Sequence, residues 1–380
     1  MNSRRFRHIA LWALAAVMTV GCGPASEEDT ELPVPPQPGS ETPIAFSGNL
    51  PEEGSGSVTR TEPRGLETVL PEGNKKFQVW AFKTVGNSTS VQIVIDGYIV
   101  KWIANSANTT TSNSSNWEYV NQGTNQSIKY WDYSALSYRF FGVAGASSTN
   151  TITGAYKPSD DNPQWYELVY ESDATNPAAT PYYSHLWVGG SDQYGQPVRL
   201  EFIQPLSKVR FKFIFEDPTQ ASTTELTAKS FRPTNGTSIK MKGDVSVSYP
   251  LTGDASETFA ATAEAEGMTD FTLDYYESVG YDNSNPSKVI EPYLGADATK
   301  TRQEYSVLPV SGQGTYTLTV SVNGEPKTTV VPAEFMEWKP GYQYTYIFKV
   351  HVDKGVSISS VQAAFTTWSF YATDHTVYNW

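Results

Sequence analysis

The sequence predicts an all-β protein. Valine, threonine and serine are abundant, aromatic residues make up 13% of the 380 residues, and no long segment repeats apolar residues at helical spacing. Many short alternating runs are instead separated by turn residues, a pattern typical of β-sandwiches. The length suffices for two domains of ordinary size.

A change of phase near the middle of the chain predicts where one sandwich ends and the next begins. Leu200 and Phe202 place apolar residues at even positions, whereas 209, 211, 213 and 215 are apolar at odd positions. One strand cannot bury both sets, because a one-residue slip moves every side chain to the opposite face. Pro205 lies between the two runs, and proline is tolerated at strand ends and bulges. We therefore expect sandwiches over residues 44–204 and 205–380.

The first residues read as a bacterial secretion signal. Arg4, Arg5 and Arg7 precede an apolar core that ends in Thr19-Val20-Gly21-Cys22. This ending resembles the lipobox of bacterial lipoproteins, with Thr19 where leucine is usual. Residues 1–21 are thus a predicted signal peptide, and acyl chains on Cys22 would hold the mature chain to a membrane leaflet. The alternative is an ordinary signal peptide that contains a chance cysteine.

Composition limits the class of partner. The formal charge of −13 disfavours nucleic acid and anionic membrane surfaces. The single cysteine excludes a disulfide within the chain, so hydrophobic burial must hold the domains together. Residues 22–43 are rich in Pro, Glu, Ser and Gly without apolar periodicity, and they predict a disordered linker.

In the first half, a short strand at Ile44–Ser47 precedes a segment with few apolar residues that contains Arg60 and Arg64. An exposed arginine in such a segment is a good site for a trypsin-like protease, although the sequence alone favours a solvated arginine of no consequence. Asp96-Gly97 between two apolar runs predicts a hairpin turn. Further strands are expected at 77–82, 91–95, 98–103, 117–120, 138–144 and 166–170.

The second half continues the pattern. Asn323-Gly324 between two alternating runs predicts a second hairpin, and Gly243-Asp244 reads as a turn before Val245. Tyr342–Val352 alternates aromatic and apolar residues with polar ones. Further strands are expected at 209–215, 271–273, 305–309, 316–322, 328–331, 356–358 and 361–370.

The sequence gives no positive indication of an enzyme, and we assign no catalytic, cofactor-binding or metal-ligating residue. His185, His351 and His375 lie apart, without metal-ligand spacing. A serine-type triad stays open, but no Gly-x-Ser-x-Gly motif supports one. The polar runs 160–162 and 282–285 could donate oxygens to calcium, although runs of this composition are usually turns.

Taken together, these features resemble the fimbrillin family of Bacteroidales, also called type V pilins, which includes the major-fimbrium-like lipoproteins. The similarity is spread over most of the chain. It consists of the lipoprotein leader and proline-rich linker, Ile44-x-Phe46, Thr59-Arg60-Thr61, the strand 77–82, the stretch 200–209, the stretch 338–346 and the closing run 361–368. Gln204 stands where the family often has histidine.

The resemblance implies two tandem transthyretin-like β-sandwiches, export to the outer membrane as a lipidated precursor, and a fimbrial subunit that serves adhesion. It also implies cleavage after Arg60, or after Arg64, by a trypsin-like protease. The N-terminal strand would then leave, and the C-terminal segment of another subunit would fill its groove. The donor residues expected from this scheme are Val356, Ile358, Val361 and Phe365.

A second function stays open from the sequence alone, namely that of a lipid-anchored surface protein that binds host or bacterial glycans. Five tryptophans lie in or beside loops rich in Asn, Ser and Thr: Trp102, Trp117, Trp131, Trp165 and Trp187. Exposed aromatic faces beside amide side chains could stack on sugars, whereas packing in a core is their commoner use.

Overall fold

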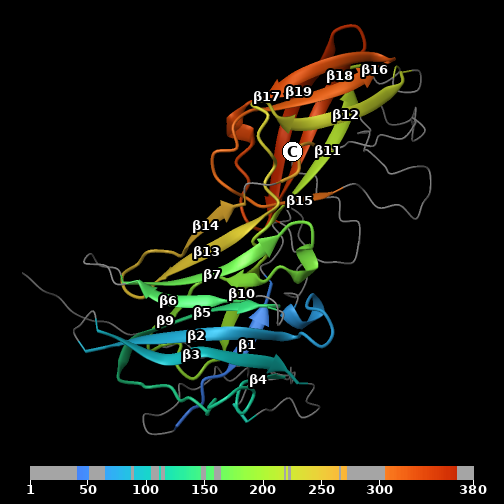
Figure 1. Ribbon diagram of the computed structural model, residues 1–380. Helices are drawn as coiled ribbons and strands as arrows, with labels where there is room; N and C mark the ends of the chain where they lie inside the picture. The colour runs from blue at the N-terminus through green and yellow to red at the C-terminus, as the bar shows by residue number, and fades with distance from the viewer. Residues whose placement is uncertain are drawn as a thin grey trace, which may run out of the picture. The chain divides into compact units, whose positions relative to one another are not determined.

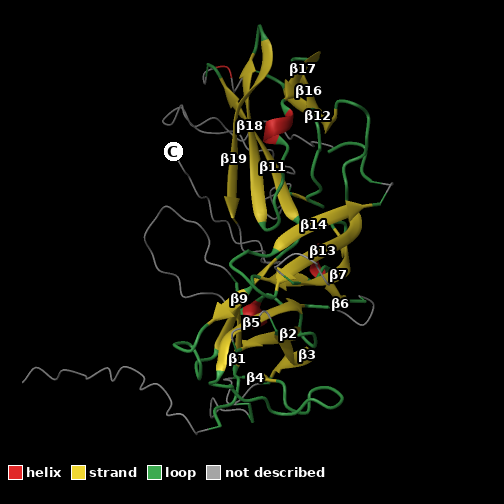
Figure 2. Ribbon diagram, turned by 90° about the vertical axis from the view of Figure 1, so that its left-hand side faces the viewer, coloured by secondary structure: helices red, strands yellow, loops and turns green. Residues whose placement is uncertain are grey.

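The computed structural model describes residues 41–50, 65–86, 90–103, 111–112, 116–146, 151–157, 164–217, 220, 224–264, 267–271 and 304–365. These residues form strands almost throughout, with short helical segments (Figure 2), so the all-β prediction is confirmed. The described helical segments are 3-10 turns: η1 (Leu66–Thr68), η2 (Pro177–Ala179) and η4 (Ala333–Phe335). No helix of this described part is long and apolar enough to cross a bilayer.

The largest sheet has the strand order β1-β10-β8-β5-β2-β3-β4, and β9 pairs with β5 beside this path. Its edge strand β1, blue in Figure 1, runs parallel to β10. The strands of this sheet are β1 (Phe46–Asn49), β2 (Lys76–Val85), β3 (Val91–Trp102), β4 (Trp117–Glu118), β5 (Ala135–Ala144), β8 (Tyr182–Ser184), β9 (Trp187–Gly189) and β10 (Val198–Ile203).

A second sheet, with the order β14-β13-β7-β6, shares one hydrophobic core with the first. Phe141 of β5 stacks on Tyr249 of β13 with ring centroids 4.0 Å apart and planes 6° from parallel. Such contacts between aromatic rings add to the stability that burial supplies. The strands are β6 (Thr153–Lys157), β7 (Trp165–Asp173), β13 (Lys242–Pro250) and β14 (Thr258–Ala263).

Two further sheets contribute a separate core in which Phe231 contacts the rings of Phe211 and Tyr346. One has the order β15-β11-β18-β19 and the other β12-β16-β17. The strands are β11 (Ser207–Phe215), β12 (Leu226–Pro233), β15 (Tyr305–Val307), β16 (Tyr316–Val322), β17 (Glu325–Val331), β18 (Tyr342–His351) and β19 (Gly355–Phe365).

The change of phase around Pro205 separates two strands, as expected. β10 ends at Ile203 in the first sheet, and β11 begins at Ser207 in the third. The boundary drawn there is nevertheless wrong for part of the second half. β13 pairs with β7 from Lys242↔Asp173 to Pro250↔Trp165, so residues 242–263 complete the first core. The alternation of Val245, Val247 and Tyr249 predicts a strand, but alternation does not say which sheet a strand joins.

Two of the three predicted turns are also wrong. Asp96 and Gly97 lie inside the continuous strand β3, where together they oppose Trp80 as a β-bulge, and Gly97 has a φ of 63°. Gly243 and Asp244 lie within β13. Asn323-Gly324 does form the hairpin between β16 and β17, with φ of 50° and 81°, so that prediction is confirmed.

Candidate functional site

The N-terminal segment, residues 42–50, lies along the edge of the first sheet and makes backbone hydrogen bonds on two sides. Ile44 N donates to Lys129 O at 2.8 Å, and Trp131 N donates to Thr42 O at 3.0 Å. Further along, Val198 N donates to Ala45 O at 2.8 Å, and β1 then follows β10 in parallel register. The segment therefore joins the stretch 129–131 to β10.

The same segment supplies part of the first core. Ile44, Phe46 and Leu50 expose 0%, 1% and 2% of their surface. The ring of Phe46 makes edge-on contacts with Phe77, Tyr119 and Phe140, at centroid distances of 6.2, 5.6 and 5.8 Å. Burying such a side chain stabilises the fold by about 1.5–3 kcal/mol. Because the segment is both buried and hydrogen-bonded, its removal would open an apolar groove beside two unpaired backbone edges.

Residues 42–50 are fixed at their start by Tyr119, a residue that the sequence analysis did not single out. The Tyr119 hydroxyl donates to Ile44 O at 3.1 Å and accepts from Lys129 N at 3.0 Å. Burial raises the pKa of Tyr119 far above its usual value, so the phenol stays protonated and able to donate. The aromatic composition of Trp117-Glu118-Tyr119 predicts a strand there but not this bond.

Tyr119 is itself held by the carboxylate of Glu118, a residue that exposes only 6% of its surface. Glu118 Oε1 accepts from Tyr119 N at 2.8 Å and from Val120 N at 2.7 Å. Its Oε2 accepts from Thr111 N at 2.6 Å and Ser112 N at 3.3 Å. One side chain thus satisfies four backbone donors where the chain is irregular. An isolated glutamate in a strand gives no sequence signal for such a role.

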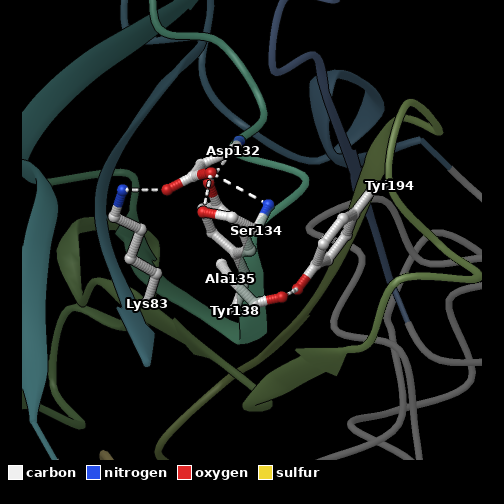
Figure 3. A network of polar contacts seen from close by, with 6 residues as sticks. All are labelled: Lys83, Asp132, Ser134, Ala135, Tyr138 and Tyr194. Carbon is white, nitrogen blue, oxygen red and sulfur yellow. Dashed lines mark hydrogen bonds and ion pairs between the residues drawn. The ribbon is translucent and has the colours of Figure 1, made fainter. Parts of the chain in front are cut away.

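A polar network holds the stretch 129–135 in place beside the N-terminal segment (Figure 3). Lys83 Nζ lies 2.7 Å from Asp132 Oδ2, and Ser134 donates to Asp132 Oδ1 through its hydroxyl at 2.6 Å. Asp132 N donates to the hydroxyl of Tyr138 at 2.7 Å, and the hydroxyl of Tyr194 donates to Ala135 O at 2.9 Å. These bonds connect β2 and β5 to the stretch 129–135, whose first three residues bond the N-terminal segment.

This network makes the free energy of unfolding depend on pH. The hydrogen bond from Lys83, with those from Ser134, lowers the pKa of Asp132 to about 2. A carboxyl group with a lowered folded-state pKa stabilises the fold above its ordinary pKa and loses that contribution as the pH falls from about 4 to about 2. We expect a loss of about 0.5–1 kcal/mol over this interval after solvent screening is allowed for. Unfolding midpoints of the wild type and Asp132→Asn between pH 5 and pH 2 check it, and equal slopes in both would contradict it.

The two predicted cleavage residues, Arg60 and Arg64, lie outside the described residues. The described ends of their segment lie together, because Asn49 pairs with Gly65 in an antiparallel bridge. Leu50 and Leu66 are buried on either side of it. A cut within residues 51–64 would therefore separate β1 from the rest of the chain without breaking a described strand.

The other predicted site residues are placed as follows. Cys22 lies outside the described residues. The donor residues Val356, Ile358, Val361 and Phe365 all lie in β19, which pairs with β18 from His351↔Gly355 to Tyr342↔Phe365. Val356 is buried in the second core. A donor made of these four residues would first have to break the β18–β19 ladder of its own subunit.

Four of the five tryptophans that suggested glycan binding belong to the first core or pack against it. Trp117 and Trp131 are buried, and Trp102, Trp165 and Trp187 are half-buried. Trp102 packs edge-on against Trp117 at 5.2 Å, and Trp131 stacks on Tyr194 at 5.1 Å. Trp102, Trp117, Trp131 and Trp187 therefore belong to the first core or pack against it, and none of the five tryptophans is exposed.

The described histidines join strands rather than forming a metal site. His185 Nδ1 lies 2.6 Å from Glu257 Oε1. His351 lies between Glu216, at 2.7 Å from Nδ1, and Ser357, at 3.0 Å from Nε2. This is the hydrogen-bond order of a serine-type triad, but Glu216 is exposed, and the three residues connect the end of β11 to the β18–β19 turn. Among the described residues, no cluster of His, Cys, Asp and Glu could hold a metal ion.

Comparison with known proteins places the chain in a family. Residues 59–368 match the sequence profile of the fimbrillin-like family, whereas no curated protein matches the chain. Similar solved structures include two provisionally named cell adhesion proteins. That of Bacteroides uniformis has 15% identity and a TM-score of 0.38, and covers 86% of this chain and 98% of its own. That of Bacteroides ovatus has 11% identity and a TM-score of 0.41, and covers 88% and 100%.

A fimbrial assembly protein from Parabacteroides distasonis has 11% identity and a TM-score of 0.33, and covers 85% of this chain and 100% of its own. The family match extends from the segment before η1 to the residues after β19. It confirms the resemblance drawn from the sequence. Because the match spans most of its length, the chain belongs to the fimbrillin-like family.

Proposed function

We propose that this protein is a non-enzymatic subunit of a cell-surface fimbrium that serves adhesion, and that it assembles by exchange of its N-terminal strand. The observation that carries the proposal is the position of β1. Among the described strands, β1 pairs with β10 alone at the edge of the sheet, yet the segment 42–50 that contains it places Ile44, Phe46 and Leu50 in the core. Membership of the fimbrillin-like family supports the same role.

Assembly begins, in this proposal, with export of the precursor to the outer membrane and acylation of Cys22. A trypsin-like protease then cuts after Arg60 or Arg64, in the segment that connects Leu50 to Leu66. After cleavage, no covalent bond connects the segment that contains β1 to the rest of the subunit. Backbone hydrogen bonds and side-chain packing alone then hold it, so it is able to leave. The partners are other fimbrial subunits, the processing protease and a surface ligand.

The vacated groove would be filled by a strand from a neighbouring subunit. The N-terminal strand satisfies the backbone of residues 129–131 on one side and of β10 on the other. An incoming strand would restore both sets of hydrogen bonds and refill the apolar positions, and this gain would drive polymerisation. The two sandwiches implied by the family would then serve as the rigid body of each subunit.

The test is proteolytic activation of the purified precursor. We expect a trypsin-like protease to convert the wild type into polymers that resist detergent, and the double variant Arg60→Ala, Arg64→Ala to stay monomeric. Arg232→Ala, at an exposed arginine on β12, is the control and should assemble normally. Polymerisation of the double variant at the rate of the wild type would contradict cleavage at these residues.

A further inference from the structure

The second sheet ends in two strands that each have one open edge. In its order β14-β13-β7-β6, β6 pairs with β7 and β14 pairs with β13 (Figure 1). Within the described ranges, no strand pairs with the outer edge of either one. All five residues of β6 are exposed, and β14 alternates between exposed and half-buried residues. The unpaired backbone N–H and C=O groups of such an edge are a template for a further strand.

The hydrogen bonds of β14 fix which of its backbone groups point outward. Glu264 N donates to Lys242 O at 2.9 Å, so these two residues, one step beyond the last paired positions, form a hydrogen-bonded pair. In an antiparallel ladder, hydrogen-bonded pairs alternate with non-hydrogen-bonded pairs. The even-numbered residues of β14 therefore bond β13, whereas residues 259, 261 and 263 direct their N–H and C=O groups to the open edge.

The outward groups of β6 follow in the same way from its neighbour β7. Leu251 N donates to Gln164 O at 2.6 Å, one step beyond the paired positions of β13 and β7. Even-numbered residues of β7 therefore bond β13, and its odd-numbered residues bond β6. Those odd-numbered residues lie opposite the odd-numbered residues of β6. Gly154 and Tyr156 consequently direct their backbone groups to the open edge of β6.

We propose that β14 of one copy of this chain pairs with β6 of a second copy, so that the second sheet continues from subunit to subunit. Each neighbouring pair of strands in the sheet is antiparallel, so β14 and β6 run in opposite directions. A second copy beside the first in the same orientation therefore presents its β14 antiparallel to β6. The contact joins two different surfaces, and it repeats along a row of subunits rather than closing as a symmetric dimer.

The outward backbone groups set the register of this contact. Tyr156 of one copy lies opposite Phe259 of the second copy, and Gly154 lies opposite Ala261. Both are hydrogen-bonded pairs of the new ladder, because all four residues direct their N–H and C=O groups to the open edges. A shift by one residue would set outward groups against inward ones and lose these bonds.

The side chains agree with this register. Within its own sheet, Tyr156 lies opposite Tyr166, and Phe259 lies opposite Val247. Tyr166 and Val247 are both buried in the first core, so Tyr156 and Phe259 lie on the same face of the extended sheet. Two aromatic residues opposite each other on one face stabilise the pairing of neighbouring strands.

Charge favours this contact over the pairing of like edges. Residues 151–157 contain one lysine, Lys157, and no acid, whereas residues 257–264 contain Glu257 and Glu264 and no base. Two β14 edges would bring four carboxylates to one contact, and two β6 edges would bring two ammonium groups together. The pairing of β6 with β14 joins edges of opposite net charge, which favours their association.

The test uses the uncleaved precursor, so it is independent of cleavage and of strand exchange. Proline lacks the backbone N–H and is tolerated in an edge strand where that N–H points outward. Tyr156→Pro therefore blocks β6, and Ala261→Pro blocks β14. In sedimentation velocity runs we expect the wild type to associate as its concentration rises, and each proline variant to associate about tenfold more weakly, because a central backbone bond is lost. Tyr156→Phe and Ala261→Ser keep the N–H group and should associate as the wild type does.

A mixture of the two proline variants tests which edges meet. Tyr156→Pro keeps an open β14 and Ala261→Pro keeps an open β6, so the mixture should form a one-to-one dimer that grows no further. Undiminished association of Tyr156→Pro alone would show that β14 pairs with β14, and undiminished association of Ala261→Pro alone would show that β6 pairs with β6. Either result overturns the proposal. A wild type that stays monomeric at its highest soluble concentration also overturns it, while strand exchange still stands.

A charge variant makes the same test without a change to the backbone. Thermal unfolding shows whether the proline variants are folded, and Lys157→Glu alters only an exposed side chain. Both edges then carry net negative charge, so we expect association to weaken about threefold at low salt and less at high salt. Association of Lys157→Glu equal to that of the wild type at low salt would contradict the pairing of β6 with β14.

Discussion

Replacement of Phe46 by alanine is expected to lower the free energy of unfolding of the intact precursor by about 3–5 kcal/mol. The ring is 99% buried and contacts three other aromatic rings, of Phe77, Tyr119 and Phe140. The truncation leaves a cavity in a packed core. Urea unfolding of the two precursors measures the loss, and Ser47→Ala, at a half-buried position of the same strand, should change it by less than 1 kcal/mol.

The same variant should behave differently once assembled. In our account β1 has left the polymer, so Phe46 contributes nothing to it. Polymers of Phe46→Ala and of the wild type should therefore dissociate at the same temperature in detergent, and the variant should assemble faster because its β1 is released more readily. A polymer weakened as much as the precursor would show that β1 stays in place.

Removal of the Glu118 carboxylate is expected to have an effect of similar size by a different mechanism. Glu118→Ala would leave the backbone amides of Thr111, Ser112, Tyr119 and Val120 without their acceptor. Each unsatisfied buried donor costs about 1–3 kcal/mol, so with partial access of water we expect a total loss of about 3–5 kcal/mol. Urea unfolding of the precursor measures it.

The series at Glu118 distinguishes hydrogen bonding from packing. Glu118→Gln keeps the shape and one acceptor oxygen, and its amide nitrogen would face two backbone donors. We expect the loss in free energy of unfolding for Glu118→Gln to be more than half of the loss for Glu118→Ala. Because Tyr119 orients Ile44, both variants should also bind β1 more weakly. A glutamine variant as stable as the wild type would mean that the four bonds contribute little.

Much of the fold follows from alternation and turn chemistry. Phe77–Phe82, Tyr138–Ala144 and Tyr342–Val352 each alternate or run apolar over a length that only a strand explains, and all three are strands. Asn323-Gly324 forms its hairpin because two consecutive residues there adopt positive φ. These are local properties, and a single sequence contains them.

The assignment of strands to sheets could not be predicted in the same way. β13 and β14 follow β11 and β12 in sequence, but β13 pairs with β7 and β14 pairs with β13. Nothing in their alternation distinguishes the two cores. Asp96-Gly97 has the composition of a hairpin turn, yet β3 continues through it, because its residues on both sides pair with β2. Tertiary pairing overrides the local signal here.

The candidate site was predictable in part. Ile44 and Phe46 mark an apolar strand ahead of an arginine-containing segment, and the structure places that strand at a sheet edge. The hydrogen bond from Tyr119 to Ile44 joins residues that are far apart in the sequence. The four bonds of Glu118 are local, but they depend on how an irregular stretch of backbone folds around its carboxylate, so no sequence motif predicts either contribution.

The central claim is that β1 leaves when the subunit assembles. The most direct measurement is mass spectrometry of polymers assembled from full-length precursor by a trypsin-like protease, after washing in detergent. We predict chains that begin at Thr61 or Gly65 and contain no peptide from residues 42–50. Recovery of that peptide in a one-to-one ratio with the rest of the chain would contradict the account.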